Sequence, residues 1–437
     1  MNKFKIIPLG GVGAVTKNMF VYETEKEIII VDCGIGFPDE PNATQEELFI
    51  PDFSYLLERK HKIKGLFITH AHFDHYGAIP HFFSKINASI PIFSSQLATE
   101  FIKGKVEDFG LSLKNLEFIN FTDRRSTIFF RDFKVTAFHI NHSVPQSLGL
   151  FIETPLGNVF HVADYKFDLT PFDDQPFDIH QVAFLSRKQP PLLLLSDCLG
   201  ATKEGYTKSE ANIEENFTDI MYKAKGLVLV TTVTSNISRI KQAVVASINT
   251  GRKIAFLGKS MEQSVEIGRK LGYFHSLKKY FIEPFKVKKS ASNKITVIAA
   301  GSYGQKGSAL DRISRDKHRL VKLGRGDTVI FSADPSPPGV GIDVNALIDN
   351  LAKKKVDIHY YETQENLYVS GHGASGDIKM LLFLTKAKYL LPIGGDYRHM
   401  YAYSKIAQNM GYQEDKVLLL EEGKILEFLN REKFIVT

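Results

Sequence analysis

Short runs of apolar residues, separated by turns, dominate the first 200 residues of the chain. Such runs occur at 28–31, 66–69, 134–140, 158–163 and 192–196. Several are continuous rather than alternating, which is typical of strands that are buried on both faces. The pattern therefore predicts a first domain built mainly of short, buried β-strands.

The pattern changes near residue 205, where longer amphipathic segments begin to alternate with buried strands. The predicted helices cover 209–225, 237–249, 261–271 and 344–352. The predicted strands between them cover 227–231, 253–257, 295–299 and 328–331. Ser209 is placed to cap the first of these helices. Strand–helix alternation is typical of a parallel sheet, so we expect an inserted α/β domain here.

The residues after about 355 are too few to enclose a core of their own. They predict a strand at 367–369, a helix at 377–387, a strand at 389–393 and a helix at 398–410. This segment is therefore expected to complete the first domain. The predicted organisation is a first domain over 1–204, an inserted domain over 205–354 and a completing part over 355–437.

Composition and charge are those of an ordinary globular protein and exclude several classes. Of the 437 residues, 43% are apolar and 24% are charged, which excludes collagenous, low-complexity and disordered chains. Two cysteines are too few for a disulfide framework. No apolar run approaches the ~18 residues of a membrane span, and the first residues have too short an apolar core for a signal peptide. We expect a cytoplasmic protein, whose net charge of +6 permits an anionic partner without requiring one.

The most informative segment is residues 69–75, which have the sequence THAHFDH and directly follow an apolar strand. Side chains with this spacing at the end of a strand converge on one pocket. Neutral imidazoles and carboxylates are ligands of zinc and manganese. The segment therefore predicts a metal site formed by His70, His72, Asp74 and His75, in preference to a surface turn that is merely rich in histidine.

Acidic and imidazole side chains also follow four other predicted strands. They are Asp32, His142, Asp164 and Asp197. A turn-forming aspartate or a hydrogen-bonded histidine would explain each one singly. Together with the histidine segment, however, polar residues at strand ends favour a functional site.

Sequence motifs spread over nearly the whole chain resemble one known family. They include PLGGVG at 8–13, VDCG at 31–34, HSVP at 142–145, ADYKFD at 163–168, TSNISR at 234–239, GSYG at 301–304 and VSGHG at 369–373. In this order they resemble the β-CASP branch of the metallo-β-lactamase fold, and within it the ribonuclease J family. The resemblance implies an αββα sandwich with an inserted β-CASP domain of parallel-sheet type, in a compact form without the C-terminal domain of longer members.

The resemblance also implies a role for each candidate residue. His70, His72 and His142 would hold a first divalent metal ion, zinc or manganese, and Asp74 and His75 a second, with Asp164 bridging the two. Asp32 would orient the ligands, Asp197 would begin the β-CASP motifs, and His372 would contact the scissile phosphate. RNA and phosphate contacts would come from Ser235, Asn236, Arg239, Gly301, Ser302, Gly304, Ser370, Gly371 and Gly373.

One position departs from the family pattern, and it affects the second metal site. The family carries a histidine ligand in the sequence PxHGEYR, whereas residues 392–398 here are PIGGDYR, so Gly394 stands in place of the imidazole. Water replacing this ligand would leave a weak second site. Alternatively His399 or Asp396 would supply the ligand, or the chain would bind RNA with little catalysis. The sequence leaves these three explanations open.

The function implied by the resemblance is metal-dependent hydrolysis of single-stranded RNA, by 5′→3′ exonuclease action on 5′-monophosphorylated ends and with endonuclease cleavage as an addition. The alternatives are an inactive RNA-binding homologue, a DNA nuclease and another metallo-hydrolase. Whether the chain forms a homodimer is left open. The inserted domain would cover the site with a groove, which argues against a small substrate. Basic residues between 286 and 319 either line the RNA channel or form a solvated face.

Overall fold

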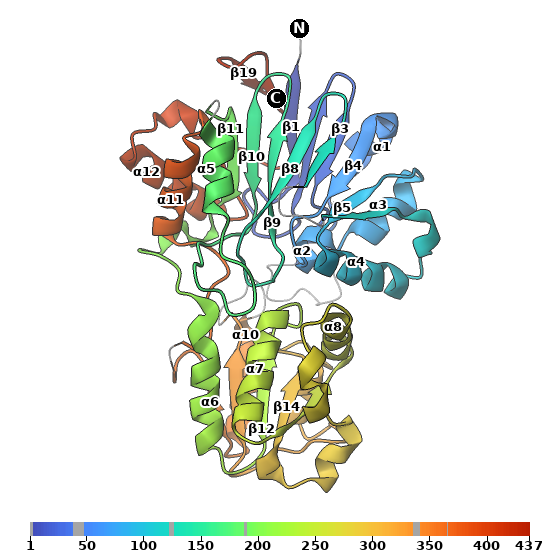
Figure 1. The fold of residues 1–437 in the computed structure, drawn as a ribbon, viewed down its shortest axis with the longest axis vertical. Coiled ribbons are helices and arrows are strands. Elements are labelled where there is room, and N and C mark those ends of the chain that lie inside the picture. Colours follow the sequence, from blue (N-terminus) through green and yellow to red (C-terminus); the bar gives the residue numbers. More distant parts are fainter. Residues whose placement is uncertain (1–2, 38–47, 122–125, 188–189, 335–340, 365) are drawn as a thin grey trace.

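The computed structural model describes residues 3–37, 48–121, 126–187, 190–334, 341–364 and 366–437. The upper part in Figure 1 consists of two mixed sheets packed face to face, with helices outside both. The lower part is a parallel sheet with helices on its two faces. The upper part is therefore the expected αββα sandwich, and the lower part is the expected parallel-sheet insertion.

The first sheet of the sandwich has eight strands in the order β19-β18-β1-β2-β3-β4-β5-β6. The strands are β1 (Phe4–Gly10), β2 (Met19–Thr24), β3 (Ile28–Val31), β4 (Ile63–Phe67), β5 (Ile92–Ser94), β6 (Phe118–Asn120), β18 (Leu426–Phe428) and β19 (Phe434–Val436). Its outer face is covered by α1 (Ser54–Glu58), α3 (Ile79–Ile86) and α4 (Gln96–Asp108).

The second sheet has six strands in the order β17-β11-β10-β9-β8-β7. The strands are β7 (Thr127–Phe129), β8 (Lys134–His139), β9 (Leu148–Glu153), β10 (Asn158–Val162), β11 (Leu193–Asp197) and β17 (Tyr389–Ile393). Helices α5 (Ile179–Arg187), α11 (Ser375–Thr385) and α12 (Tyr397–Asn409) lie outside it.

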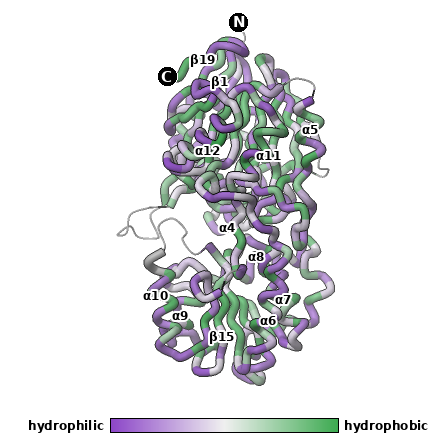
Figure 2. The backbone as a smooth tube through the Cα atoms, turned by 90° about the vertical axis from the view of Figure 1, so that its left-hand side faces the viewer, coloured by the Kyte–Doolittle hydropathy of each residue, from purple (hydrophilic) through white to green (hydrophobic). Residues whose placement is uncertain are grey.

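The core of the sandwich follows from the two-residue period of its strands. On β1, Phe4 and Ile6 pack between the sheets, whereas Ile7 and Leu9 face the helices on the outside. In the inserted domain, Figure 2 likewise shows apolar residues concentrated along the central strands, near β15 (Thr328–Ser332). Both faces of these strands are buried, which explains why their sequences are continuous apolar runs.

The inserted sheet has the order β13-β14-β12-β15-β16, with all neighbours parallel. Its strands are β12 (Val228–Thr232), β13 (Lys253–Leu257), β14 (Ile295–Ala299), β15 (Thr328–Ser332) and β16 (Asp357–His359). Its helices are α6 (Ile213–Lys223), α7 (Ile237–Asn249), α8 (Lys259–Lys270), α9 (Ala309–Ser314) and α10 (Gly341–Ala352).

The chain enters the insertion after β11 and has returned to the sandwich before β17, because α11 already lies outside the second sheet. These two strands are direct neighbours in the second sheet, with Leu195 opposite Leu391. The carboxyl ends of β12, β14 and β15 point toward the sandwich, so the two parts face each other across a cleft. The limits at 204 and 354 proposed from the sequence stay a prediction.

One expectation about secondary structure was incomplete and one was wrong. The first 200 residues carry α3, α4 and α5 besides their strands, because these amphipathic helices cover the outer faces of the sheets. The segment 367–369 is not a strand: the carbonyl of Leu367 accepts hydrogen bonds from Ser332 Oγ and Arg239 Nη1 instead of joining a ladder. Among the described residues, no helix combines the length and the apolar character needed to cross a bilayer.

The interior of the sandwich contains a titratable group that makes stability depend on pH. His161 on β10 is fully buried, and its Nδ1 lies 2.7 Å from the Tyr22 hydroxyl. Burial lowers the pKa of His161 from 6.5 to about 3. The unfolded chain therefore binds this proton more readily, and stability is lost as the pH falls below about 6.5.

We expect His161→Gln to reduce this pH dependence while keeping a hydrogen-bonding partner for Tyr22. Between pH 7.5 and 5.5, the wild type should lose about 1.4 kcal/mol more of its free energy of unfolding than the variant does. Urea unfolding at the two pH values measures this difference. Equal losses in both proteins would contradict the assignment.

Candidate active site

The candidate residues meet where the strands of both sheets end, at the edge that faces the inserted domain. Asp32 follows β3, His70 and His72 lie in the loop after β4, and this loop leads into the single turn α2 (Phe73–Tyr76) that carries Asp74 and His75. His142 follows β8, Asp164 follows β10, and Asp197 is the last residue of β11. Buried strands with polar ends thus bring together residues that lie far apart in the sequence.

A first cluster is formed by His70, His72, His142 and Asp164. The Nδ1 of His72 lies 3.1 Å from His70 Nε2 and 3.0 Å from His142 Nε2. Asp164 Oδ2 lies 3.6 Å from both of these Nε2 atoms. Ligands of a tetrahedral ion with bonds of about 2.05 Å lie about 3.3 Å apart, so this donor set fits zinc or a similar divalent ion.

Burial favours the neutral form of the imidazoles of the first cluster, and a hydrogen bond fixes the tautomer of His142. Burial lowers the pKa values of His70 and His72 well below 6.5, and that of His142 to about 3. His142 Nδ1 donates to the carbonyl of Gly371 at 2.8 Å, which leaves the lone pair on Nε2. A neutral imidazole with a fixed outer hydrogen bond is the form that binds a metal ion.

A second cluster shares Asp164 with the first. His75 Nε2 lies 3.4 Å from Asp164 Oδ2 and 3.5 Å from Asp74 Oδ2. The same oxygen, Asp164 Oδ2, therefore faces both clusters, as a bridging carboxylate would. This arrangement supports the roles predicted for Asp74, His75 and Asp164.

Asp32 positions ligands of both clusters from behind. Its Oδ2 accepts a hydrogen bond from His75 Nδ1 at 2.8 Å, and its Oδ1 accepts one from the Thr69 amide at 2.8 Å. The Thr69 hydroxyl donates to Asp32 at 2.9 Å, so its oxygen is free to accept from His70 Nδ1 at 3.0 Å. Asp32 thus fixes His75 directly and His70 through Thr69, and its role in orienting metal ligands stays a prediction.

We expect Asp32→Asn to weaken binding of the second metal ion about 10- to 100-fold, because an amide cannot accept from both Thr69 and His75. Calorimetric titration of the metal-free protein with Mn²⁺ measures this effect. Asp357→Asn, a change at an exposed aspartate, is the matched control. Unaltered affinity at both sites in Asp32→Asn would contradict the assignment.

His372 and Asp197 form a charged pair beside the clusters. His372 Nδ1 donates to Asp197 Oδ2 at 2.7 Å. Burial lowers the pKa of His372, but the carboxylates of Asp197 and Asp164 raise it by more, to about 9. The resulting imidazolium is suited to an anionic group such as a phosphate.

Gly394 lies next to the same carboxylates. A Cβ atom at this glycine would be 3.5 Å from Asp197 Oδ1 and 3.6 Å from Asp164 Oδ1, so a side chain here would point into the site. Its φ of +68° favours glycine. Neither proposed substitute takes this place: His399 Nδ1 accepts from the Asp396 amide at the start of α12, and Asp396 pairs with Arg398.

The clusters lie in a cleft of about 1530 Å³ between the sandwich and the inserted domain. The sandwich contributes His72, Asp74, His142, Asp164, Gly371 and His372 to its lining. The inserted domain contributes Ser235, Asn236, Tyr303 and Lys306 among others. A polymer segment fits this space, which agrees with the argument against a small substrate.

Two predicted phosphate contacts are corrected by the structure. Arg239 is 1% exposed, and its guanidinium donates to Gln242, Ser332 and Glu210. Its hydrogen bonds are therefore used inside the protein, so it is an internal anchor. The amide of Gly373 donates to the Tyr165 carbonyl, and the amide of His372 donates to Ser370 Oγ at 3.1 Å. The Gly373 amide is thus also occupied.

The other predicted loop residues differ in their access to the cleft. Ser235 lies in the cleft wall, and the side chain of Asn236 accepts from the Arg239 amide to cap α7. Gly301, Ser302 and Gly304 shape the turn that carries Tyr303 into the cleft, with φ values of +114° at Gly301 and +71° at Gly304. Tyr303 belongs to the motif at 301–304, but no role was predicted for its side chain, because a tyrosine in a glycine-rich turn carries no distinctive signal.

Asn18 is a second residue that sequence reasoning did not place in the site. It is 2% exposed, and its Nδ2 lies 3.1 Å from His75 Nε2 and 3.4 Å from Asp74 Oδ2. It lies between β1 and β2, far in sequence from the histidine segment. Only its inclusion in a family motif could have drawn attention to it.

Comparisons with known families agree with this geometry. A model of the metallo-beta-lactamase superfamily matches residues 12–199, and a model described as "Ribonuclease J, beta-CASP domain" matches residues 225–351. A solved structure of a protein of unknown function from Enterococcus faecalis V583 shares the fold, with a TM-score of 0.67, 13% identity, and coverage of 98% of this chain and 100% of that chain.

Curated relatives align over nearly the whole chain. Ribonuclease J of Helicobacter pylori strain 26695 is 38% identical over 423 residues, which is 97% of this chain and 60% of the relative. Ribonuclease J2 of Bacillus subtilis is 35% identical, and the match covers 97% of this chain and 75% of the relative. Ribonuclease J 1 of Streptococcus pyogenes is 37% identical, and the match covers 97% of this chain and 74% of the relative. The chain thus spans about 60% of the length of the Helicobacter relative.

Proposed function

Because this chain belongs to the ribonuclease J family, with a metallo-β-lactamase fold and an inserted β-CASP domain, we propose that it is a metal-dependent ribonuclease acting on single-stranded RNA. The observation that carries the proposal is the pair of His/Asp clusters that share Asp164 Oδ2 at the floor of the cleft. Action from a 5′-monophosphorylated end in the 5′→3′ direction, with endonuclease cleavage as an addition, is part of the proposal and rests on the family resemblance.

The donor set fits two divalent ions, held by His70, His72, His142 and Asp164 and by Asp74, His75 and Asp164. Such ions, when bound, supply Lewis-acid polarisation of a phosphodiester and acidify the attacking water. The protein orients this chemistry through Asp32 and Thr69, which fix the ligand tautomers. The His372 imidazolium, held by Asp197, binds the phosphate oxygens, where negative charge develops in the transition state.

The test uses a six-nucleotide 5′-monophosphorylated RNA and the matching DNA, with titrations of Mn²⁺ and Zn²⁺. We expect mononucleotides from the RNA only, a strict need for metal, and no product from Asp74→Ala. Glu215→Ala, an exposed acidic position, controls for nonspecific effects of substitution. Cleavage without metal, or cleavage of the DNA alone, would overturn the proposal.

A second candidate is an RNA-binding protein with little catalysis, and Gly394 is the observation that favours it. The position that faces Asp164 and Asp197 offers no ligand atom of its own, so water would complete the second site and weaken it. Gly394→His adds an imidazole there, and Gly394→Ala adds the strain of a side chain at positive φ without a ligand. Tighter binding of the second Mn²⁺ in the histidine variant alone supports a weak second site. RNA binding without cleavage at any metal concentration would favour the non-catalytic function.

A further inference from the structure

The charge of the chain is concentrated in one segment of the inserted domain. Residues 278–325 contain 13 Lys and Arg but only 3 Asp and Glu, a net charge of +10. The whole chain carries +6, so the remaining residues carry −4. The basic character of the protein is therefore local, and its position in the fold decides what it contacts.

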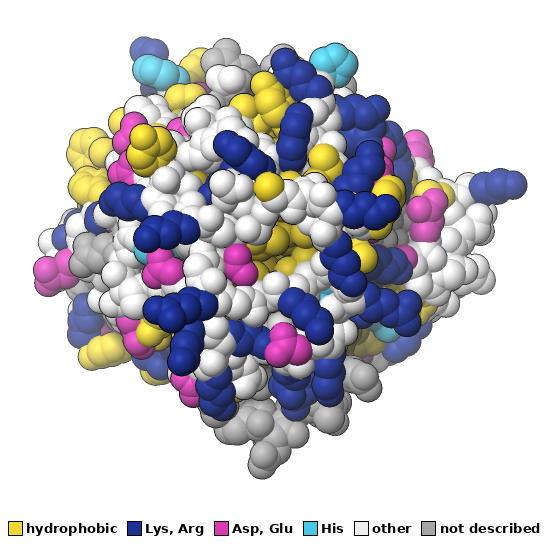
Figure 3. Space-filling model, turned by 90° about the horizontal axis from the view of Figure 1, so that it is seen from below, with side chains coloured by type: hydrophobic (Ala, Val, Ile, Leu, Met, Phe, Trp, Pro, Cys, Tyr) yellow, Lys and Arg dark blue, Asp and Glu magenta, His cyan; other side chains and the backbone are white. Residues whose placement is uncertain are grey.

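Six of these cations lie at the end of the inserted domain that is remote from the cleft. Residues 275–294 form three short 3₁₀ turns before β14, at the amino ends of the parallel strands. The cleft is at the opposite, carboxyl ends, and none of the cations at 278–294 lines it. Figure 3 views this end and shows Lys and Arg crowded over it. The sequence left open whether Lys286, Lys288 and Lys289 line the RNA channel or form a solvated face, and the structure places them away from the cleft.

The lysines at the remote end of the inserted domain form no ion pairs among the described residues. Lys278, Lys279, Lys286, Lys288, Lys289 and Lys294 are exposed, and among the described residues none of them has a carboxylate within 4.0 Å. Many lysines elsewhere are paired, for example Lys134 with Glu153 and Lys241 with Asp173. Unpaired cations held close together repel one another and raise the local potential. A bound polyanion would relieve that repulsion.

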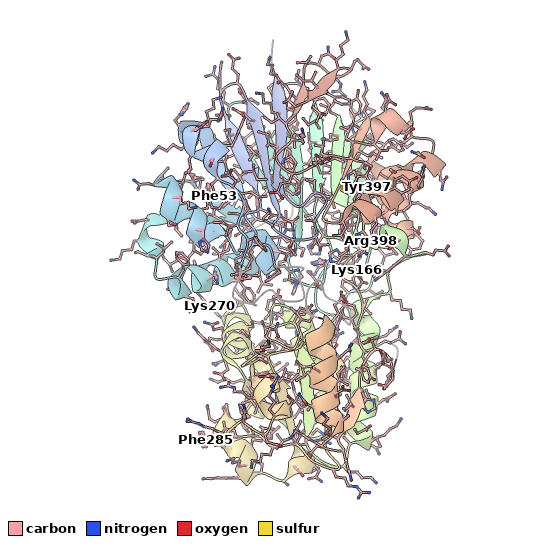
Figure 4. The ribbon with its side chains drawn as sticks, turned by 180° about the vertical axis from the view of Figure 1, so that it is seen from behind. Phe53, Lys166, Lys270, Phe285, Tyr397 and Arg398 are labelled. Atoms are coloured by element: carbon pink, nitrogen blue, oxygen red, sulfur yellow. The ribbon has the colours of Figure 1, made fainter. Side chains whose placement is uncertain are left out.

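An exposed aromatic residue directly precedes three of these lysines in the sequence. Phe285 is 56% exposed, at the far end of the inserted domain in Figure 4, and the Lys286 ammonium lies 6.0 Å from its ring centre. Lysines interleaved with an exposed aromatic ring suit nucleic acid, because phosphates pair with the cations and a base stacks on the ring. A single exposed aromatic is too little apolar area to insert into a membrane, which argues against a lipid surface.

We infer that the distal lysine surface, defined as Lys278, Lys279, Lys286, Lys288, Lys289 and Lys294 together with Phe285, is a second RNA-binding site, separate from the cleft. The inference rests on the proposed function, since it takes the bound polyanion to be the substrate strand. Helix α7 runs from the cleft toward this end over 13 residues, so the two sites are at least about 20 Å apart. Only a long RNA reaches both sites, and for such an RNA the second contact raises the effective concentration at the cleft.

The test compares the charge-reversal variant K286E/K288E/K289E with the wild type by fluorescence anisotropy. The probes are six- and thirty-nucleotide 5′-monophosphorylated RNAs, without added metal so that no cleavage occurs. At about 3.4 Å per stacked nucleotide, the shorter RNA spans about 20 Å and fills only the cleft. We expect the Kd of the longer RNA to rise at least about 10-fold, and the slope of its log affinity against log salt concentration to fall in magnitude by about 2. The Kd of the shorter RNA should change less than about 2-fold.

The matched control is K379E/K386E/K405E, which reverses three exposed lysines on α11, after α11 and on α12. The neutral variant K286Q/K288Q/K289Q should show the same effect at smaller size. Unchanged affinity and salt slope for the longer RNA would overturn the inference, as would binding at this surface to phosphatidylserine vesicles but not to RNA. Cleavage of the six-nucleotide RNA by K286E/K288E/K289E with added metal is measured in a separate assay. Absence of this cleavage in the wild type would count against the proposed function, whereas unchanged binding of the longer RNA would count only against the distal lysine surface.

Discussion

Replacing Asp164 with alanine is expected to remove the second metal ion, weaken the first, and lower RNA cleavage by at least about 10³-fold. Asp164 Oδ2 lies 3.6 Å from the Nε2 atoms of His70 and His142 and 3.4 Å from that of His75, so one substitution removes a ligand from both clusters. The loss of a single electrostatic contact to the transition state already costs about 10²–10³ in rate.

The measurement pairs metal stoichiometry after dialysis with the initial rate on the six-nucleotide RNA. Asp164→Asn keeps the volume of the side chain and tests whether its charge is required. Asp357→Asn, at an exposed position that does not line the cleft, is the control for dialysis losses. Two ions retained in Asp164→Ala would show that Asp164 does not bridge the clusters.

Replacing Glu210 with alanine is expected to destabilise the protein by about 3 kcal/mol or more. Glu210 is buried between Lys166 and Arg239, which are 0% and 1% exposed, and it forms ion pairs with both. Removing one partner of a buried ion pair leaves an uncompensated charge, which typically costs 3–5 kcal/mol. Two buried cations would lose their partner here, although Asp168 Oδ2 remains 3.9 Å from Lys166 Nζ.

Urea unfolding measures this loss, and Glu215→Ala, an exposed neighbour, is the matched control. Glu210→Gln should recover part of the stability because it keeps the hydrogen-bonding shape without the charge. Figure 4 places Lys166 at the junction of the two parts, and Lys166 lies two residues after Asp164. A loss below about 1 kcal/mol in Glu210→Ala would show that these ion pairs do not hold the junction together.

The local patterns of the sequence predicted much of the fold because they depend on neighbouring residues. The strands at 134–140 and 253–257 and the helix at 237–249 agree with β8, β13 and α7 within a residue or so. The strand proposed at 367–369 failed because the hydrogen-bonding partners of its carbonyls are decided by tertiary contacts. The helices of the first 200 residues were missed because their apolar stripes interrupt a pattern dominated by strands.

In the candidate site, too, residues marked by a local sequence pattern could be predicted, and residues placed by tertiary contacts could not. The segment at 69–75 is dense enough in ligands to identify itself, and Asp32 and Asp164 follow strands that could be recognised. The role of Arg239 could not be foreseen, since the sequence does not show that Glu210 lies opposite its guanidinium. Asn18 and Tyr303 enter the site through loops whose paths no local pattern records.

The pairing of β11 with β17 has a consequence for how the chain folds during synthesis. Ile393, the last residue of β17, is made 196 residues after Asp197, the last residue of β11. At 5–20 residues per second, the ribosome takes about 10–40 s to cover that distance. During this time the edge of β11 has no partner strand, and an open edge pairs readily with other extended chains. Until β17 is made, the edge of β11 is therefore the place where the nascent protein is open to pairing with another chain.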